Sequence, residues 1–163
     1  MRILWVSALI VAGDQLSKYV IKANLSLHSP VPVLGDFFRL TFVENSGIAF
    51  GIKIGTALPL FTGLSLLAVG IITYYLYQAR SSHVAVQTAL ALILGGAIGN
   101  IIDRITYGRV VDFLDFGIGT YRFYIFNLAD SAVTVGVGLY LLMSFLLPQE
   151  SQEAEIEAGQ GME

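Results

Sequence analysis

The stretch Gly95–Asp130 reads GGAIGNIIDRITYGRVVDFLDFGIGTYRFYIFNLAD, and it decides how the chain is organised. It begins in one apolar segment, crosses a short connection and ends inside the next apolar segment. A charge at the centre of a bilayer costs at least roughly 2.5 kcal/mol, so polar residues on such segments mark a functional site by default. The polar side chains considered as site residues are Asn100, Asp103, Arg104, Asp112, Asp115, Asn127 and Asp130.

The composition is that of an integral membrane protein. Of the 163 residues, 55% are hydrophobic and only 13% charged, and the mean hydropathy is +0.72. A soluble domain carries about 25% charged residues. We expect one domain over residues 1–147. Residues 148–163 hold five of the twelve acids and no base, which predicts a disordered acidic tail.

Several classes of function are excluded by the residues that the chain lacks. It has no cysteine, which excludes thiol catalysis, disulfides and thiolate metal sites. It has no basic tract, which argues against a nucleic-acid partner. His28 and His83 are expected on opposite sides of the membrane, so a histidine metal site is not predicted, and no metal or cofactor is expected.

Four segments have the length to cross a bilayer, which takes about 20 mostly apolar residues. Three of them are Thr56–Tyr77, Val84–Ile102 and Ile125–Leu147. The first, Ile3–Ile21, is also compatible with a cleaved secretory signal, because its uninterrupted apolar run is short. We favour a retained helix, since Asp14 and Lys18 have the spacing of a helical ion pair.

Between the spans the pattern changes to that of strands. Phe37–Val43 is rich in strand formers, and Arg109–Phe116 with Tyr121–Phe126 reads as a hairpin turning at Gly117–Thr120. The fold class is therefore a mainly α membrane protein with four transmembrane helices, a small extramembrane sheet and a hairpin. Four spans place both termini on one side and both long loops on the other. The distribution of Lys and Arg does not decide which side is cytoplasmic.

Helical spacing places the polar residues of each span on one face of the helix. Asn100 and Arg104 lie on one helix face with Gly96, and Asn127 and Asp130 lie on a polar stripe of the last span. Asp112 lies on the hairpin strand between these two helices, so the fold could bring Asp112 and Asp130 together. Two adjacent carboxyls share one proton, which leaves one base to activate water and one acid to bond a carbonyl oxygen.

Several of the polar residues also have a structural interpretation. Asp103 and Arg104 could form an ion pair that ends the third span, and Asp115 could be a solvated loop acid. Asp14 and Lys18 could only stabilise the first helix. Asp130 could pair with Arg104 near the start of the last span, where acids are favoured.

Five motifs in order resemble the lipoprotein signal peptidase (bacterial signal peptidase II) family, and together they cover all of the chain except the tail. They are Asp14-Gln15-x-x-Lys18, Asn45-Ser46-Gly47-Ile48-Ala49-Phe50, Gly95-Gly96-Ala97-x-Gly99-Asn100-x-x-Asp103-Arg104, Val110-Val111-Asp112-Phe113 and Phe126-Asn127-Leu128-Ala129-Asp130-Ser131. One departure is Ile48, where the family usually has alanine.

The resemblance implies an aspartic endopeptidase without cofactor or metal, with Asp112 and Asp130 as the catalytic pair. It implies cleavage of a prolipoprotein just before a diacylglyceryl-modified cysteine. It also implies a site at the extracytoplasmic face of the bacterial cytoplasmic membrane and both termini in the cytoplasm. We expect a monomer among membrane lipids, with Phe37–Phe50 as a surface cradle for substrate. The expected supporting residues are Asp14, Lys18, Asn45, Gly47, Gly96, Asn100, Arg104, Asn127 and Ala129.

Two other functions fit the residues alone. A proton- or cation-coupled carrier could use Asp14, Arg104 and Asp130 as an ion site, although carriers usually show repeated halves and no repeat is evident here. A non-catalytic assembly subunit could dock through Gly95-x-x-x-Gly99, which leaves Asp112 and Asp130 without a purpose.

Overall fold

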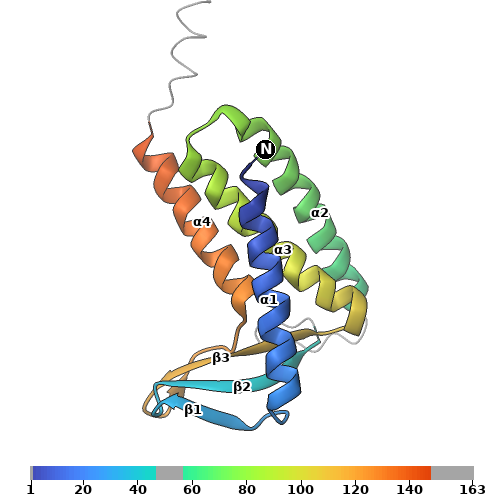
Figure 1. Cartoon of the computed structure of the whole chain (residues 1–163), viewed down its shortest axis with the longest axis vertical. Helices are drawn as coiled ribbons and strands as arrows, with labels where there is room; N and C mark the ends of the chain where they lie inside the picture. The colour runs from blue at the N-terminus through green and yellow to red at the C-terminus, as the bar shows by residue number, and fades with distance from the viewer. Residues whose placement is uncertain (1, 47–56, 148–163) are drawn as a thin grey trace, which may run out of the picture.

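The structure, a computed structural model, describes residues 2–46 and 57–147. A bundle of helices stands over a small sheet at one end (Figure 1). The helices are α1 (Leu4–Asn24), α2 (Ala57–Gln78), α3 (Val84–Tyr107) and α4 (Leu128–Leu146), with a short 3-10 turn η2 (Ala79–Ser81). The strands are β1 (Pro30–Leu34), β2 (Phe38–Asn45), β3 (Val110–Ile118) and β4 (Tyr121–Arg122).

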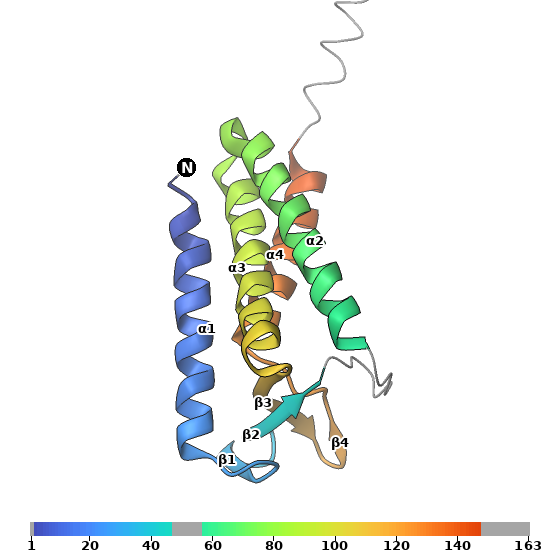
Figure 2. The ribbon, with the colours of Figure 1, turned by 90° about the vertical axis from the view of Figure 1, so that its right-hand side faces the viewer.

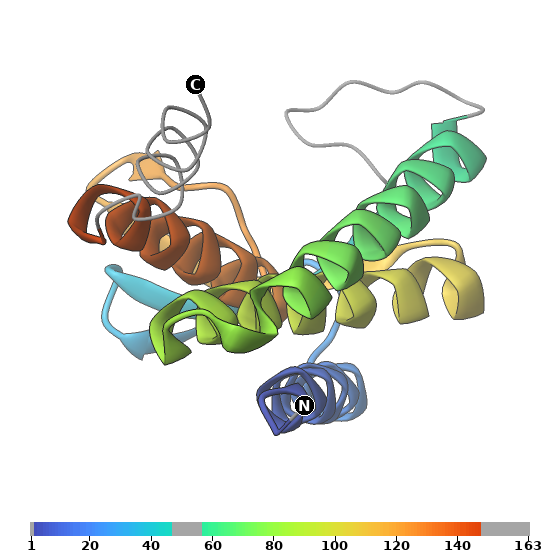
Figure 3. The same ribbon diagram turned by 90° about the horizontal axis from the view of Figure 1, so that it is seen from above.

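Helix α3 is the centre of the bundle and contacts each of the other three helices. Helix α1 packs on one side of α3, and α2 and α4 pack on other sides of it (Figures 2 and 3). The N-terminus and the last turn of α4 lie at the end of the bundle opposite the sheet (Figure 1). The start of α1 and the end of α4 therefore lie at the same end of the described bundle, and the strands lie at the other end (Figure 1).

The four strands form one antiparallel sheet in the order β1-β2-β3-β4. Its apolar side packs on the end of α1, where Ile21 forms a buried cluster with Phe42, Val111 and Phe113. On the other side, Thr41 donates a hydrogen bond to Asp115. Phe42 and Thr41 therefore lie on opposite faces of β2, and the apolar face lies against a helix.

The sequence does not predict strand β1, because Pro30 and Pro32 weigh against a strand there. Proline lacks a backbone N–H and is tolerated at the edge of a sheet, and β1 is the edge strand here. The predicted return strand Tyr121–Phe126 is too long. Only Tyr121–Arg122 pairs as a strand, and Phe126 forms a single bridge with Leu114.

Three helical stretches of the described chain are long and apolar enough to cross a membrane: Thr62–Ser81 in α2 and η2, Val84–Tyr107 in α3 and Leu128–Leu146 in α4. Helix α1 has 21 residues, which is also a sufficient length. It contains Asp14, Lys18 and Lys22, and it is not among the three. Asp14 and Lys18 are buried against the rest of the bundle, with 0% and 2% of their surface exposed, so α1 contributes polar residues to the core.

Glycines let α3 and α4 approach closely. A Cβ at Gly136 of α4 would lie 2.7 Å from Ile93 Cγ1 and 2.8 Å from the carbonyl oxygen of Ala89, both on α3. Gly138, two residues further along α4, would meet no atom within 4 Å. The contact between these helices therefore depends on the absence of a side chain at Gly136.

These two glycines provide a matched pair of substitutions. We expect Gly136→Ala to destabilise the protein by about 1–3 kcal/mol, because the added methyl overpacks the interface. Gly138→Ala should be neutral or stabilising by up to ~1 kcal/mol, because alanine favours the helix. Thermal unfolding in detergent micelles measures both. Equal unfolding temperatures for the two variants would contradict this account of the interface.

Candidate functional site

Strand β3 presents Asp112 between two core residues. Its neighbours Val111 and Phe113 belong to the apolar cluster at the end of α1. Successive side chains of a strand point to opposite faces, so Asp112 points away from that cluster. It is nevertheless only 2% exposed, because residues of α4 and β2 cover it.

The first turn of α4 holds Asp130. Asn127 is the N-cap residue, and its side-chain oxygen accepts a hydrogen bond from the backbone N–H of Asp130 at 2.9 Å. The carboxylate of Asp130 in turn accepts from the backbone N–H of Asn127 at 3.3 Å. This reciprocal capping box explains why α4 begins at Leu128 rather than at the predicted Ile125, and it fixes Asp130 at the end of the bundle near the sheet.

Two asparagine amides join the acids into one network. Asn127 Nδ2 donates to Asp112 Oδ1 at 2.7 Å and to Asn100 Oδ1 at 3.1 Å. Asn100 Nδ2 donates to Asp130 Oδ1 at 2.7 Å. Asp112 and Asp130 are thus linked through Asn127, which bonds to both of them. Residues 18 positions apart in the sequence meet at one place because the chain turns back after β3 through β4, and the bridge between Leu114 and Phe126 brings the cap of α4 beside β3.

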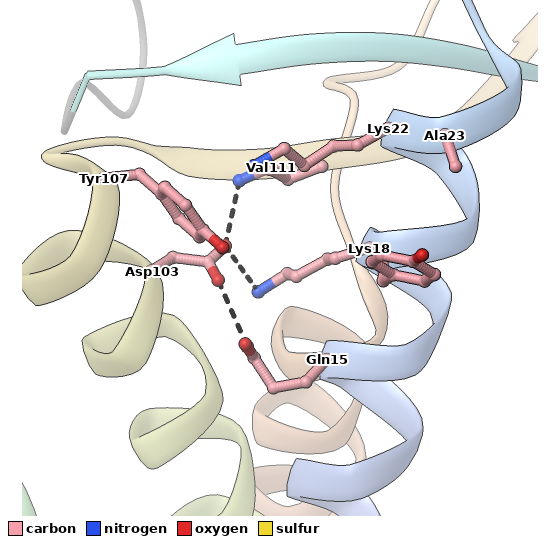
Figure 4. A pocket seen from close by; sticks show the side chains of 8 residues that line it. Gln15, Lys18, Lys22, Ala23, Asp103, Tyr107 and Val111 are labelled. Atoms are coloured by element: carbon pink, nitrogen blue, oxygen red, sulfur yellow. Dashed lines mark hydrogen bonds and ion pairs between the residues drawn. The ribbon is translucent and has the colours of Figure 1, made fainter.

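A buried lysine supports these amides from the side of α1. Lys18 Nζ lies 2.7 Å from Asp14 Oδ2 and 3.0 Å from Asp103 Oδ2, and it donates to Asn100 Oδ1 at 3.0 Å. Asp103 also accepts from the backbone N–H of Val111 (Figure 4). The predicted pair Asp14–Lys18 is confirmed, and each of the three N–H donors of the ammonium has an oxygen partner.

Close backbone packing holds this cluster together. Asp14 Oδ1 accepts from the backbone N–H of Ala129 at 3.0 Å, which ties α1 to the first turn of α4. A Cβ at Gly99 would lie 2.6 Å from Asp14 Oδ2, and one at Gly96 would collide with the carbonyl oxygen of Ala129. Gly96 and Ala129, both predicted as supporting residues, are therefore contact points between helices.

Strand β2 contributes Asn45 at its end. Asn45 Nδ2 donates to Asp112 Oδ2 at 3.0 Å and also bonds to the hydroxyl of Tyr124. Tyr124 is not among the residues that the sequence predicts for the site. Its contact with Asn45 places it beside the carboxyl pair.

Arg104 extends from α3 toward α2. It is half-buried, and its Nη1 donates to Ser65 Oγ at 3.5 Å. Its charge interacts with the charges of Asp130, Asp112 and Asp103. Among the described residues it forms no ion pair with Asp103 or Asp130, and its buried Nε has no hydrogen-bond partner. The guanidinium therefore lies beside the acids without neutralising either one by contact.

Burial raises the pKa of Asp112 from 3.8 to about 7, and the negative charge of Asp130 adds to this effect. Hydrogen bonds from Asn45 and Asn127 act in the opposite direction. Burial also raises the pKa of Tyr124, again with contributions from the charges of Asp112 and Asp130. A carboxyl with a pKa near neutrality exchanges a proton easily at physiological pH, which suits an acid-base role for Asp112.

Within the described ranges 2–46 and 57–147, no group of three or more His, Cys, Asp or Glu side chains could hold a metal ion. The acids of the site bond to amide, ammonium and backbone N–H groups instead. The arrangement fits a reaction in which carboxyls bind and activate water and a carbonyl group.

Comparison with known proteins gives the family. The sequence profile described as "Signal peptidase (SPase) II" matches residues 6–146. The chain belongs to the signal peptidase II family. It is 45% identical over 142 residues to a lipoprotein signal peptidase of Syntrophotalea carbinolica, covering 86% of this chain and 88% of the relative. It is 39% identical over 150 residues to that of Syntrophus aciditrophicus, covering 90% and 92%.

Solved structures agree with the family assignment. One is a bacterial membrane enzyme structure at 2.3 Å resolution, which is 32% identical in sequence and superposes with a TM-score of 0.80. The match covers 93% of this chain and 91% of the chain of that enzyme. A second such structure, at 1.9 Å, is 33% identical with a TM-score of 0.78 and covers 91% and 94%. The similarity to these two membrane enzymes therefore extends over both the bundle and the sheet.

The structure brings together most of the residues that the motifs of this signal peptidase II family member predicted. Gly47 and Ile48 lie outside the described residues. The gathered residues are Asp14, Lys18, Asn45, Gly96, Asn100, Arg104, Asp112, Asn127, Ala129 and Asp130.

Two structural interpretations from the sequence are wrong. Asp103 pairs with Lys18 of α1, not with Arg104, because its position on α3 faces α1. Asp115 is not a solvated loop acid. It lies on β3, is 5% exposed, and pairs with Arg122 of β4 at 2.6 Å, so it holds the hairpin together.

Three residues of the site were missed by sequence reasoning. Gln15 donates to Asp103 and to the carbonyl of Gly99, and its place beside Asp14 was the only signal for it. Ser65 and Tyr124 contact Arg104 and Asn45. Each is a single polar residue in an otherwise ordinary segment, so no spacing pattern identifies it.

The Lys18 cluster can be tested by stability. Replacing Lys18 with Met leaves Asp14 and Asp103 buried without their cation, and breaking a buried pair costs about 3–5 kcal/mol. Lys22→Met, one turn further along α1 at an exposed position, is the matched control and should change stability by less than ~0.5 kcal/mol. Thermal unfolding in micelles distinguishes them. A Lys18→Met protein as stable as the control would mean that the cluster does not stabilise the folded protein.

Proposed function

We propose that this chain is a membrane-embedded aspartic endopeptidase that removes the signal peptide from prolipoproteins, cleaving before the diacylglyceryl-modified cysteine. The observation that carries the proposal is the pair Asp112 and Asp130, held in one hydrogen-bond network by Asn127. Membership of the signal peptidase II family supports the peptidase activity. The alternative of a coupled carrier finds no support in the relatives.

We propose four membrane spans, with α1 as the first. Two of the three charges that make α1 less apolar than the other helices, Asp14 and Lys18, are buried and pair with each other, and the third, Lys22, lies in the last turn of the helix. Its outer surface carries large apolar side chains, with Trp5 74% and Leu9 70% exposed. Exposed apolar residues along a helix are expected where lipid, not water, surrounds it.

The sheet end is proposed to face the extracytoplasmic side of the bacterial cytoplasmic membrane, with both termini in the cytoplasm. Residues 1–147 would then form one peptidase domain that ends before the acidic tail. The site lies where α3 and α4 meet the sheet, so a lipid-modified cysteine could be held at the bilayer surface while its acyl chains remain in the membrane. Such anchoring would position the scissile bond beside the acids. Of the expected cradle Phe37–Phe50, residues 37–46 lie in the described chain and would contact the substrate, and residues 47–50 lie outside it. We expect the monomer to be sufficient.

In the proposed mechanism Asp112 holds the shared proton, because it is the more deeply buried of the two acids. Asp130, which accepts N–H groups from Asn100 and Asn127, takes a proton from water. The water oxygen bonds to the scissile carbonyl carbon while Asp112 gives its proton to the carbonyl oxygen. The resulting diol collapses, the C–N bond breaks, and the departing nitrogen takes the proton from Asp130. The carbonyl is restored as its hydroxyl proton returns to Asp112.

The supporting residues act on charge and orientation in this scheme. Asn45 bonds to the second oxygen of Asp112 and so orients it toward the substrate. Arg104, which forms no contact ion pair with either acid of the described site, would stabilise negative charge that develops on the reacting carbonyl. Neither role requires a metal or a cofactor.

The carboxyl pair is tested by isosteric substitution. Asp112→Asn and Asp130→Asn should each reduce turnover at least ~10³-fold, because neither amide can serve as the acid or the base. Asp36→Asn is the matched control, since the side chain of Asp36 is 83% exposed on a turn of the sheet, and it should retain activity. The assay uses a diacylglyceryl-modified precursor peptide with mass analysis of the products. Retained turnover in Asp112→Asn would exclude the dyad.

The pH dependence tests which acid carries the proton. Below a pH of about 7 Asp112 holds its proton, and above it the group ionises, so turnover should fall as the pH rises through about 7. The bond from Asn45 lowers the pKa of Asp112, so Asn45→Ala should move this fall to a higher pH. Single-turnover rates across pH 5–9 measure it. A fall at the same pH in both proteins would argue against Asp112 as the acid.

A further inference from the structure

A recess of about 340 Å³ lies between α1, α3 and β3, separate from the acid pair. Its lining includes Lys18, Tyr19, Lys22, Asp103, Tyr107 and Val111. Figure 4 shows the side chains of α1 and α3 converging there next to the strand. No residue of α2 or α4 lines it, whereas Arg104 of the proposed site bonds to α2. The recess is therefore on the other side of α3 from Arg104.

The polar groups at the floor of the recess already have hydrogen-bond and ion-pair partners within the protein. Lys18 and Asp103 are paired with each other, and both are at most 2% exposed. Asp103 also accepts from Gln15 and from the backbone of Val111. With these acceptors and donors occupied, the floor is a neutralised polar surface. It offers no free carboxylate to a cation.

The rim supplies a positive charge. Lys22 is exposed, and its Nζ lies 3.6 Å from the centre of the Tyr107 ring. Among the described residues no carboxylate lies within ion-pair distance of Lys22, since the described ion pairs involve Lys18, Arg39, Arg109 and Arg122. A cation held in place over an aromatic ring and unpaired with an acid is available to an anion.

Two hydroxyl groups lie on the same rim. Tyr19 is 70% and Tyr107 is 53% exposed, and neither hydroxyl has a hydrogen-bond partner within the described chain. Tyrosine is enriched where a helix passes through the bilayer surface. In the proposed membrane orientation, this end of α1 and α3 lies at that depth, where lipid phosphates are found.

We propose that the recess binds the phosphate of an anionic phospholipid headgroup, held by the ammonium of Lys22 and the hydroxyls of Tyr19 and Tyr107. Basic pockets between transmembrane helices bind anionic headgroups in this way. The volume matches the lower end of ligand sites, which suits a headgroup and not a whole lipid. The inference depends on the membrane embedding proposed above but not on the peptidase chemistry.

The test counts retained lipids. Wild type and variants are purified from mixed micelles of phosphatidylglycerol and phosphatidylcholine, and native mass spectrometry measures the lipid that remains bound. We expect wild type to retain one phosphatidylglycerol, Lys22→Gln to retain roughly fivefold less, and Lys22→Arg to restore retention. Arg80→Gln is the matched control, because Arg80 lies over the Tyr77 ring in the same way and belongs to η2, the connection between α2 and α3.

The outcomes separate the possibilities. Equal retention by Lys22→Gln and wild type, or equal losses in Lys22→Gln and Arg80→Gln, would overturn the proposal. Displacement of the lipid by millimolar glycerol phosphate would show a site for soluble phosphate and would also overturn it. Because binding is measured without turnover, failure of the peptidase proposal leaves this result unchanged. Monodisperse elution and an unaltered unfolding temperature establish that Lys22→Gln is folded.

Discussion

The buried ammonium of Lys18 is the constraint on which the polar core depends. A charge removed from water is stable only when its hydrogen bonds are satisfied inside the protein. Lys18 meets that requirement with oxygens of Asp14, Asp103 and Asn100. Asp14 also bonds to the first turn of α4, and Asp103 bonds to the backbone of β3. One cation therefore fixes α1, α3, α4 and the sheet relative to one another.

The orientation of the site amides follows from this cation. An ammonium only donates, so Lys18 requires the oxygen of Asn100 to face it, and the NH₂ group of Asn100 then points to Asp130. The N-cap bond likewise requires the oxygen of Asn127 to face the backbone of Asp130, which directs its NH₂ group to Asp112. Both acids are thus held by donors whose direction is set by neighbouring groups, the kind of preorganisation that a reactive site needs.

The sequence predicts the parts of this arrangement that follow from spacing. Long apolar runs gave the helices to within a few residues, and the i,i+4 spacing gave the pair Asp14–Lys18. Contacts between distant segments were harder. The partner of Asp103 depends on how α1 packs against α3, and the position of Asp115 depends on pairing within the sheet. Neither is encoded in local periodicity. The edge strand β1 was missed because proline weighs against a strand in the sequence but is tolerated at the edge.

The same constraint explains why α1 differs from the other helices. A helix with Asp14, Gln15 and Lys18 in mid-course would be costly in lipid if those groups faced outward. In the structure they face α3 and pair there, and the opposite face of α1 exposes Trp5, Leu9 and Leu16. Overall hydropathy averages the two faces and so understates how well the outer one suits lipid. The least apolar of the four helices is therefore the one that carries the buried cation Lys18 and its partner Asp14.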